Sequence, residues 1–262
     1  MDAIVTAGGI PLPEDPLYSY TEGHSKAMLA IAGKPMIQWV LDALSASKSV
    51  DNVIIIGMTE NSGVTCSKPV HYLPSEGRML ANIVAGVHKS LELDSKTEYV
   101  LIVSSDIPAL SGEMVDWLVG EVDKDPGDIH YGVIPRAVME KRFPDSRRTW
   151  THLKGLDVCG ADINVTHIRM ATEHLETWEE LIGKRKSPLK QAATIGLGTL
   201  LLLVLRRLTL DDLVRRVSKQ IGIRGKAVVW PWAEAGMDVD KPHQLEIMRA
   251  DLARLSTESA PL

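Results

Sequence analysis

A lysine near the start of the chain lies in a sequence setting that suits phosphate chemistry. Lys26 follows a Gly8-Gly9 pair and a proline-rich loop, and it precedes a short apolar segment, 27–31. Glycines let a backbone approach a ligand closely, and the exposed N–H groups of such a turn bind anions. The stretch therefore suggests a phosphate site. The alternative is a simple glycine turn beside a surface loop, with Lys26 in solvent.

Two widespread phosphate-binding motifs do not match this stretch. A Walker A loop requires a Ser or Thr after its Gly-Lys pair, but Gly33-Lys34 is followed by Pro35, and Met28 stands where the first glycine should be. The segment 8–11 does not supply the G-x-G-x-x-G of dinucleotide-binding folds. Neither a P-loop NTPase nor a nicotinamide-dependent dehydrogenase follows from these residues.

Two acidic sites could hold a divalent cation. Asp106 comes directly after an apolar run, before Pro108, and Asp238 and Asp240 precede the last helical pattern of the chain. In open α/β sheets ligands bind outside the carboxyl ends of strands. A nucleotide-bound Mg²⁺ takes one or two carboxylates besides phosphate oxygens and water. The alternatives are a turn residue for Asp106 and a helix N-cap for Asp240.

Alternating apolar runs and helical patterns would position these residues. The apolar runs are continuous, as in strands covered on both faces, and they alternate with helical segments, so right-handed βαβ units with a parallel sheet are expected. We expect strands at 3–7, 53–57, 70–73, 100–103, 129–134 and 227–230, and helices at 36–44, 79–91, 114–122, 168–182 and 243–255. Thr209 and Asp212 form a T-x-x-D capping pattern for one more helix. A single domain over 1–262 is the simplest organisation.

The region 128–220 is less regular and is interpreted as a variable acceptor, lid or oligomer-contact region. The basic segment 141–154 is expected to be a hairpin or lid over the sheet, or else a solvated loop. The segment 194–208 contains six consecutive aliphatic residues, 200–205, with basic residues on both sides. It is too short to span a bilayer, and a helix buried in the domain or in a homodimer contact is favoured over an in-plane lipid-binding helix.

Composition narrows the class of protein and its setting. The 262 residues carry a net charge of −5, which argues against nucleic-acid binding as the main role. The only two cysteines, Cys66 and Cys159, lack metal-ligand spacing, and the N-terminus lacks the pattern of a signal peptide. A cytoplasmic protein without membrane contact is expected.

Taken in order along the chain, these pieces resemble a known enzyme family. They are Ala7-Gly8-Gly9, the run from Ser25-Lys26 through Gly33-Lys34-Pro35, Ser105-Asp106-Ile107-Pro108, and Asp238-Val239-Asp240-Lys241-Pro242. They are similar to the nucleotidyltransferases of the molybdenum-cofactor guanylyl- or cytidylyltransferase type, which are relatives of the sugar-1-phosphate and methylerythritol-phosphate enzymes.

This resemblance implies a fold, an activity and a set of site residues. The fold would be a Rossmann-like, GT-A-like three-layer α/β/α nucleotidyltransferase fold with a mostly parallel mixed sheet. The activity would be metal-dependent transfer of NMP from an NTP to a phosphorylated small-molecule acceptor, with release of pyrophosphate and with Mg²⁺ or Mn²⁺ as cofactor. By position, the implied residues are Lys26 and Asp106 for catalysis; Ala7, Gly8, Gly9, Lys26 and Ser105 for the nucleotide; Gly160 and Asp162 for the acceptor; and Asp106, Asp240 and Asp238 for the metal.

One departure from the family pattern leaves two other classes open. The family's first loop carries a second glycine and an arginine for the triphosphate, but this chain has no arginine before Arg78. Either Lys34 or the basic loop around Arg147 would have to replace it. A non-catalytic nucleotide or sugar-nucleotide sensor is one alternative. A GT-A-type glycosyltransferase that uses Asp238-Val239-Asp240 as its D-x-D motif is the other.

Overall fold

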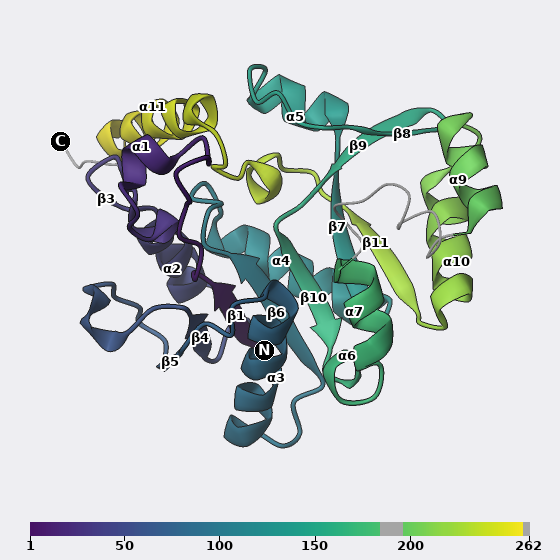
Figure 1. Ribbon diagram of the computed structural model, residues 1–262, viewed down its shortest axis with the longest axis horizontal. Coiled ribbons are helices and arrows are strands. Elements are labelled where there is room, and N and C mark those ends of the chain that lie inside the picture. Colours follow the sequence, from purple (N-terminus) through teal and green to yellow (C-terminus); the bar gives the residue numbers. More distant parts are fainter. Residues whose placement is uncertain (184–195, 259–262) are drawn as a thin grey trace.

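A computed structural model describes residues 1–183 and 196–258, and a mixed β-sheet forms the centre of this part of the chain (Figure 1). The sheet has nine described strands: eight follow the order β5-β4-β1-β6-β10-β7-β9-β8, and β11 pairs with β7 beside this path. Their bounds are β1 (Asp2–Thr6), β4 (Val53–Ile56), β5 (Val70–Leu73), β6 (Tyr99–Ser104), β7 (Ile129–Pro135), β8 (Thr151–Leu153), β9 (Leu156–Gly160), β10 (Ile163–His167) and β11 (Gly225–Val229). A separate hairpin joins β2 (Ala30–Ile31) to β3 (Lys34–Pro35).

Strand direction decides which residues meet at one edge of the sheet. Strands β5, β4, β1 and β6 are parallel, so their carboxyl ends share an edge. Strand β10 is antiparallel to β6, and Ile163 at its start pairs with Val103 near the end of β6. The residue that precedes β10, Asp162, therefore lies at the same edge as the residues that follow β1 and β6.

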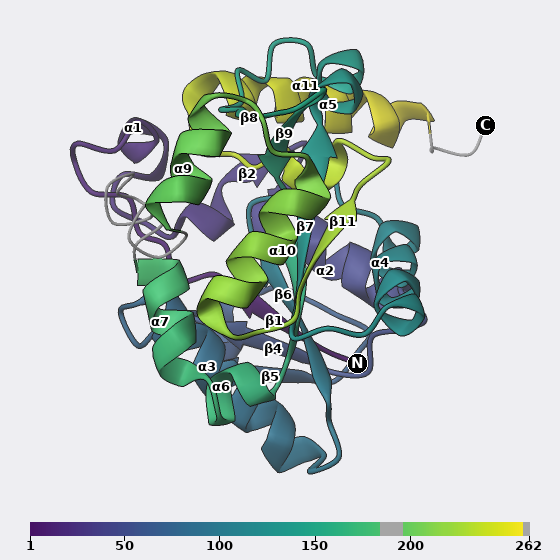
Figure 2. The same cartoon turned by 90° about the vertical axis from the view of Figure 1, so that its right-hand side faces the viewer.

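Helices cover both faces of the sheet, as expected for three layers. On one face α2 (Met36–Ala46) and α4 (Gly112–Lys124) pack over a core that includes alternate strand residues such as Val5 and Ile55. On the other face α3 (Met79–Leu93), α6 (Arg169–Thr172) and α7 (Leu175–Gly183) pack over Ile4 and Ile54. Strand side chains alternate between faces, so continuous apolar runs supply both cores. The helix α10 (Leu210–Ile221) packs on β11, which pairs with β7 (Figure 2).

Most predicted elements are present, with two differences in the middle of the chain. The helix expected at 168–182 is interrupted, because the chain turns at Glu173-His174, where both backbone N–H groups bond to the Arg169 carbonyl. The segment 141–154 contains the end of α5 (Arg136–Arg142), an irregular stretch and β8, which forms a hairpin with β9. The hairpin expected within 141–154 therefore has other bounds: it is formed by residues 151–160, and only its first strand lies in the expected segment.

A capping residue marks the start of α10 as predicted. The Asp212 backbone N–H donates to the Thr209 hydroxyl, 3.2 Å away, at the start of α10. The closing helix α11 (Pro242–Glu258) begins with proline, whose missing N–H is harmless at that position.

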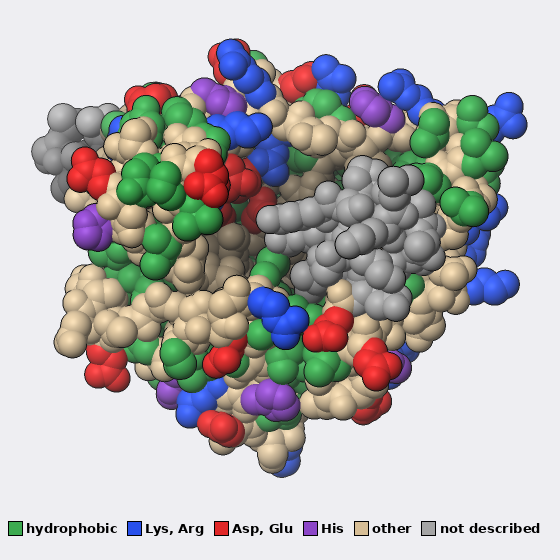
Figure 3. Space-filling model, in the orientation of Figure 1, with side chains coloured by type: hydrophobic (Ala, Val, Ile, Leu, Met, Phe, Trp, Pro, Cys, Tyr) green, Lys and Arg blue, Asp and Glu red, His purple; other side chains and the backbone are tan. Residues whose placement is uncertain are grey.

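The leucine-rich segment is less buried than expected. Its described part forms α9 (Leu197–Val204), and residues 194–195 lie outside the described residues. Leu197, Leu201 and Val204 are each at least 60% exposed, and hydrophobic side chains gather over α9 in Figure 3. The expectation that this helix is buried within the domain is wrong for the face that carries Leu197, Leu201 and Val204. Leu203 of α9 does pack against the domain, where it contacts the cluster of Val133, Leu153 and Val158. Among the described residues, no helix is long and apolar enough to cross a membrane.

Candidate active site

Lys26 joins the two predicted acidic sites at the carboxyl edge of the sheet. Its ammonium lies 2.6 Å from Asp106 Oδ2 and also forms an ion pair with Asp240. The Lys26 and Asp106 side chains are only 18% and 15% exposed, whereas Asp240 is more than half exposed. Burial would lower the pKa of Lys26, but the Asp106 and Asp240 carboxylates outweigh it and hold this pKa above its ordinary value. Lys26 is thus not a solvated surface residue.

Backbone hydrogen bonds fix this arrangement. The Lys26 N–H donates to the Gly9 carbonyl over 2.9 Å, which ties the lysine to the glycine turn after β1. The Val239 N–H donates to the Asp106 carbonyl over 3.0 Å, which holds the 238–240 segment against the end of β6. These bonds explain how residues far apart in sequence share one cation.

A second ion-pair group borders the first. Arg148, from the irregular stretch before β8, pairs with Asp238, and its guanidinium lies 3.8 Å from Asp162 Oδ2. The Asp162 carbonyl accepts from the Ser104 N–H, so Asp162 is anchored at the end of β6. About a third of the Asp162 side chain is exposed, but Oδ2 is buried, and this burial together with the negative charges of Asp106 and Asp240 raises the pKa of Asp162 to about 7. Acidic and basic side chains gather at the hollow on this face (Figure 3).

The glycine turn is packed against a neighbouring strand end. Ala7 donates its N–H to the Ile56 carbonyl, and Ser105 donates to the Thr6 carbonyl. Gly57 has a φ of +92°, and a Cβ at this position would lie 2.3 Å from Gly8 Cα. Only glycine allows the chains after β1 and β4 to approach this closely. Gly8, Gly9 and Ser105 thus lie at the same edge as Lys26, as the resemblance implies.

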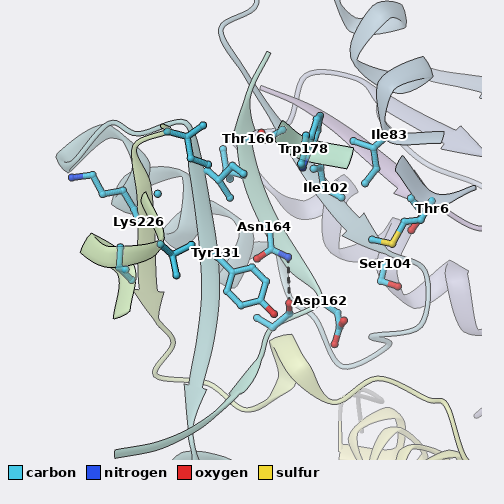
Figure 4. A pocket seen from close by; sticks show the side chains of 18 of the residues that line it. Thr6, Ile83, Ile102, Ser104, Tyr131, Asp162, Asn164, Thr166, Trp178 and Lys226 are labelled. Carbon is cyan, nitrogen blue, oxygen red and sulfur yellow. Dashed lines mark hydrogen bonds between the residues drawn. The ribbon is translucent and has the colours of Figure 1, made fainter. Parts of the chain in front are cut away.

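A cavity of about 630 Å³ opens from the acidic group and runs along the sheet face (Figure 4). Asp106, Asp162, Asp238 and Asp240 line one part of it. Gly160, the other predicted acceptor residue, abuts the Tyr131 side chain, which lines the cavity. A Cβ at Gly160 would lie 2.5 Å from the Tyr131 hydroxyl. Gly160 therefore makes room for Tyr131.

Lys34 and the basic loop around Arg147, the two candidates for replacing the missing loop arginine, differ in whether they reach the acidic residues. Lys34 pairs with Asp42, its ammonium lies 3.7 Å from the centre of the Trp39 ring, and it is not among the described residues that line the cavity. In the basic loop, the arginine that reaches the acidic residues is Arg148, next to Arg147. Sequence reasoning included Arg148 only as part of a basic segment, because nothing in its spacing shows that it faces Asp238.

The carboxylates suit a nucleotide-bound magnesium ion better than a metal ion that is held by protein ligands alone. No group of three or more His, Cys, Asp or Glu side chains suited to a metal occurs among the described residues. Buried Asp106 Oδ1 has no hydrogen-bond partner in the described part of the chain. Asp106, Asp238 and Asp240, with Asp162 partly protonated near pH 7, face two cations, so a divalent ion would offset the remaining negative charge. A nucleotide-bound Mg²⁺ uses few protein ligands, and Asp106 with Asp240 would supply such a set.

Comparison with known proteins identifies the family. Residues 19–187 match the family model of the MobA-like NTP transferase domain, which is well over half of the chain. The chain belongs to this nucleotidyltransferase family, as its sequence motifs indicated. The match begins after the glycine turn and the loop that lacks the arginine.

Solved structures agree with this assignment. A hypothetical transferase structure from Thermus thermophilus is 30% identical, with a TM-score of 0.80, over 93% of this chain and 98% of that chain. The structure of CMP:2-keto-3-deoxy-manno-octonic acid synthetase complexed with CTP is 16% identical, with a TM-score of 0.60, over 97% of this chain and 98% of that chain. The second likeness shows the fold, and it confirms the predicted nucleotidyltransferase architecture.

Curated relatives are similar over a shorter range. A probable molybdenum cofactor guanylyltransferase of Thermococcus gammatolerans is 26% identical over 39% of this chain and 50% of its own length. A molybdenum cofactor guanylyltransferase of Yersinia pestis is 27% identical over 37% of this chain and 47% of its own length. The chain thus spans about half the length of the curated relatives it matches.

Proposed function

We propose that this protein transfers a nucleoside monophosphate from an NTP to a phosphorylated small-molecule acceptor and releases pyrophosphate. The observation that carries the proposal is the Lys26 ammonium, held between Asp106 and Asp240 beside the glycine turn. Family membership supports the same reaction class. A sensor would need a nucleotide pocket but would not need a buried lysine held between two carboxylates at the sheet edge.

In the proposed reaction, an oxygen of the acceptor phosphate attacks the α-phosphorus of the NTP. The bond from this phosphorus to the bridging oxygen breaks, and pyrophosphate leaves with the electron pair. The acceptor phosphate is already ionised at neutral pH, so no general base is required. Such transfers depend mostly on positioning and on stabilising charge.

Each residue has a definite part in this proposal. The glycine turn at Gly8-Gly9, with Ala7 and Ser105, would bind the nucleotide through backbone groups. Lys26 would stabilise the charge that grows on the phosphate oxygens. Asp106 and Asp240, with Asp238 nearby, would hold Mg²⁺ or Mn²⁺, which when bound supplies Lewis-acid polarisation of the phosphate. Asp162, which lines the cavity, and Gly160, which abuts the lining residue Tyr131, would lie on the acceptor side.

The proposal is tested by pyrophosphate release. The protein is incubated with Mg²⁺, each of the five common nucleoside triphosphates and a panel of phosphorylated acceptors. Lys26→Met retains the aliphatic stem and should lose at least a hundredfold in kcat/KM, because a preorganised charge can contribute several kcal/mol to the transition state. Lys34→Met is the matched control, since Lys34 pairs with Asp42 away from the cavity. Nucleotide binding without pyrophosphate release across the panel would identify a sensor instead.

A further inference from the structure

The cavity that starts at the acidic residues continues as an apolar trough. Its wall is the amphipathic helix α10, which presents Val214, Val217 and Ile221 at helical spacing, and its floor includes Ile102 and Ile129 of the sheet. No residue of α10 is fully buried, although these three face the sheet side of the helix. The apolar stripe of α10 therefore borders the cavity at Val214 and Val217, while Ile221 also packs against the core that contains Ile4 and Ile54.

Four of the polar side chains that line this trough, Asn164, Thr166, Ser218 and Lys226, already have partners within the protein. The Asn164 amide accepts from the Gly132 N–H over 2.8 Å and donates to the Ala161 carbonyl (Figure 4). The Thr166 hydroxyl donates to the Asp128 carbonyl over 3.2 Å, and the Ser218 hydroxyl accepts from the Gly225 N–H over 3.0 Å. At the far part of the trough Lys226 pairs with Asp125. A ligand hydroxyl buried beside these four side chains would find their groups already engaged, and burying an unpaired hydroxyl is unfavourable.

The trough is continuous with the reactive end of the site. Asp106 and Asp240, which contact Lys26, line the same cavity as Val214 and Ile221. The glycine-turn residues Gly8 and Gly9 are not among the described residues that line it. Thr6 and Ser104 also line it, but α10 packs on β11, and β7, β10 and β6 lie between β11 and β1. The apolar part along α10 thus lies away from the glycine turn, on the side where the group attached to an acceptor phosphate would lie.

We infer that the acceptor is a phosphate monoester of a hydrocarbon group, and that this group binds along α10 in the trough. The inference rests on the proposed function and specifies its acceptor. The extended chain from Asp162 through β10 to Thr166 is about 14 Å long, and α10 from Val214 to Ile221 rises about 10 Å, so the trough accommodates a chain of several methylenes. A sugar phosphate would leave its hydroxyls unpaired there.

The test is a ladder of n-alkyl phosphates from ethyl to octyl, titrated calorimetrically with Mg²⁺ and an α,β-methylene nucleoside triphosphate, which cannot react. Each added methylene should tighten binding about fourfold until the trough is filled, equivalent to about 0.8 kcal/mol per methylene. Glycerol phosphate and glucose 1-phosphate should bind no better than ethyl phosphate. Chain-length-independent binding, or tighter binding of the sugar phosphate, would overturn the inference.

Variants of α10 locate the binding site. Val217→Asp places a charge on the trough wall and should abolish the chain-length dependence, whereas Gln220→Asp adds the same charge at an exposed position of the same helix and should retain it. Val217→Trp fills the trough without a charge and should weaken only the longer alkyl phosphates, which covers the case in which the aspartate variant does not fold. Unchanged ladders in both Val217 variants would overturn the assignment to this trough.

Turnover distinguishes failure of this inference from failure of the proposed function. If sugar phosphates but not alkyl phosphates release pyrophosphate from an NTP, the transfer reaction stands and the apolar acceptor is wrong. If alkyl phosphates show the binding ladder but no nucleotide yields pyrophosphate, the binding site stands and the transfer is wrong.

Discussion

Replacing Lys26 with methionine is expected to destabilise the protein, and Mg²⁺ is expected to restore part of the loss. Methionine retains the aliphatic stem and removes only the ammonium. Both Lys26 and Asp106 are less than a fifth exposed, so the change leaves a buried carboxylate without its partner. Breaking such a pair costs about 3–5 kcal/mol, and the more exposed Asp240 adds less than about 1 kcal/mol. The expected net loss is therefore about 3–5 kcal/mol at pH 7.

The magnesium effect follows from mass action. A cation at ten times its Kd stabilises the folded state by about 1.4 kcal/mol. In Lys26→Met this cation no longer competes with the ammonium for the two carboxylates, so the thermal midpoint should rise more with Mg²⁺ than it does in the wild type. A difference of about 1 kcal/mol corresponds to roughly 2–4 °C for a chain of this size.

Differential scanning fluorimetry measures both effects. Lys34→Met is the control for loss of a lysine ion pair outside the cavity, and NaCl at equal ionic strength is the control for screening. A Lys26→Met protein as stable as the wild type, with no specific response to Mg²⁺, would refute the view that Lys26, Asp106 and Asp240 form one charge group.

Three further predictions concern the acidic pair, a buried aspartate and the exposed helix. Asp106→Asn and Asp240→Asn should each weaken Mg²⁺-dependent nucleotide binding, and titration calorimetry should show the double variant little worse than either single one; additive losses would mean independent roles. Asp128 is almost fully buried, and burial by itself would raise the pKa of its carboxyl group. The Arg224 N–H and the Arg169 guanidinium outweigh burial and lower the pKa of Asp128. Its stabilisation is therefore present above the ordinary pKa of 3.8 and is lost as the pH falls through the lowered pKa. Chemical denaturation should show Asp128→Asn less stable than wild type by about 2–4 kcal/mol at pH 7, and this difference in stability should shrink in acid. The control Asp125→Asn, which breaks an exposed pair, should cost less than about 1 kcal/mol. A difference between Asp128→Asn and wild type that stays constant with pH would contradict this reasoning. If the exposed face of α9 is a contact between copies of the chain, Leu201→Glu should shift the protein to monomer in sedimentation without affecting liposome binding, and salt-sensitive co-sedimentation with anionic liposomes would favour a lipid contact instead.

The parts of the fold that sequence reasoning predicted well are those whose pattern is local. The run Val53–Ile56 is apolar on both faces and proved to be a buried strand, and Thr209 with Asp212 marked the start of α10. Lys26 and Asp106 could be singled out because a glycine turn and a strand end are visible in the sequence. The meeting of Asp106 with Asp240 was predicted from the general rule that strand ends share an edge.

The features that escaped prediction depend on contacts between distant segments. Arg148 lies in an irregular stretch with no periodicity, and only the fold shows that it pairs with Asp238. The direction of β10 places Asp162 at the active edge, but a short strand does not reveal from its residues whether it runs parallel or antiparallel. The apolar runs of 194–208 indicated burial, yet hydrophobicity cannot distinguish a buried helix from the exposed face seen in α9.

The most direct test of the proposed activity is single-turnover pyrophosphate release from an α-³²P-labelled nucleotide, with Mg²⁺, an alkyl phosphate acceptor and either wild type or Lys26→Met. The wild type should form a labelled acceptor in the same amount as pyrophosphate, and Lys26→Met should form it at least a hundredfold more slowly while Lys34→Met remains unaffected. Equal rates in the wild type and Lys26→Met, or labelled nucleotide that stays intact with every base and acceptor, would contradict a nucleotidyl transfer carried by Lys26 at this site.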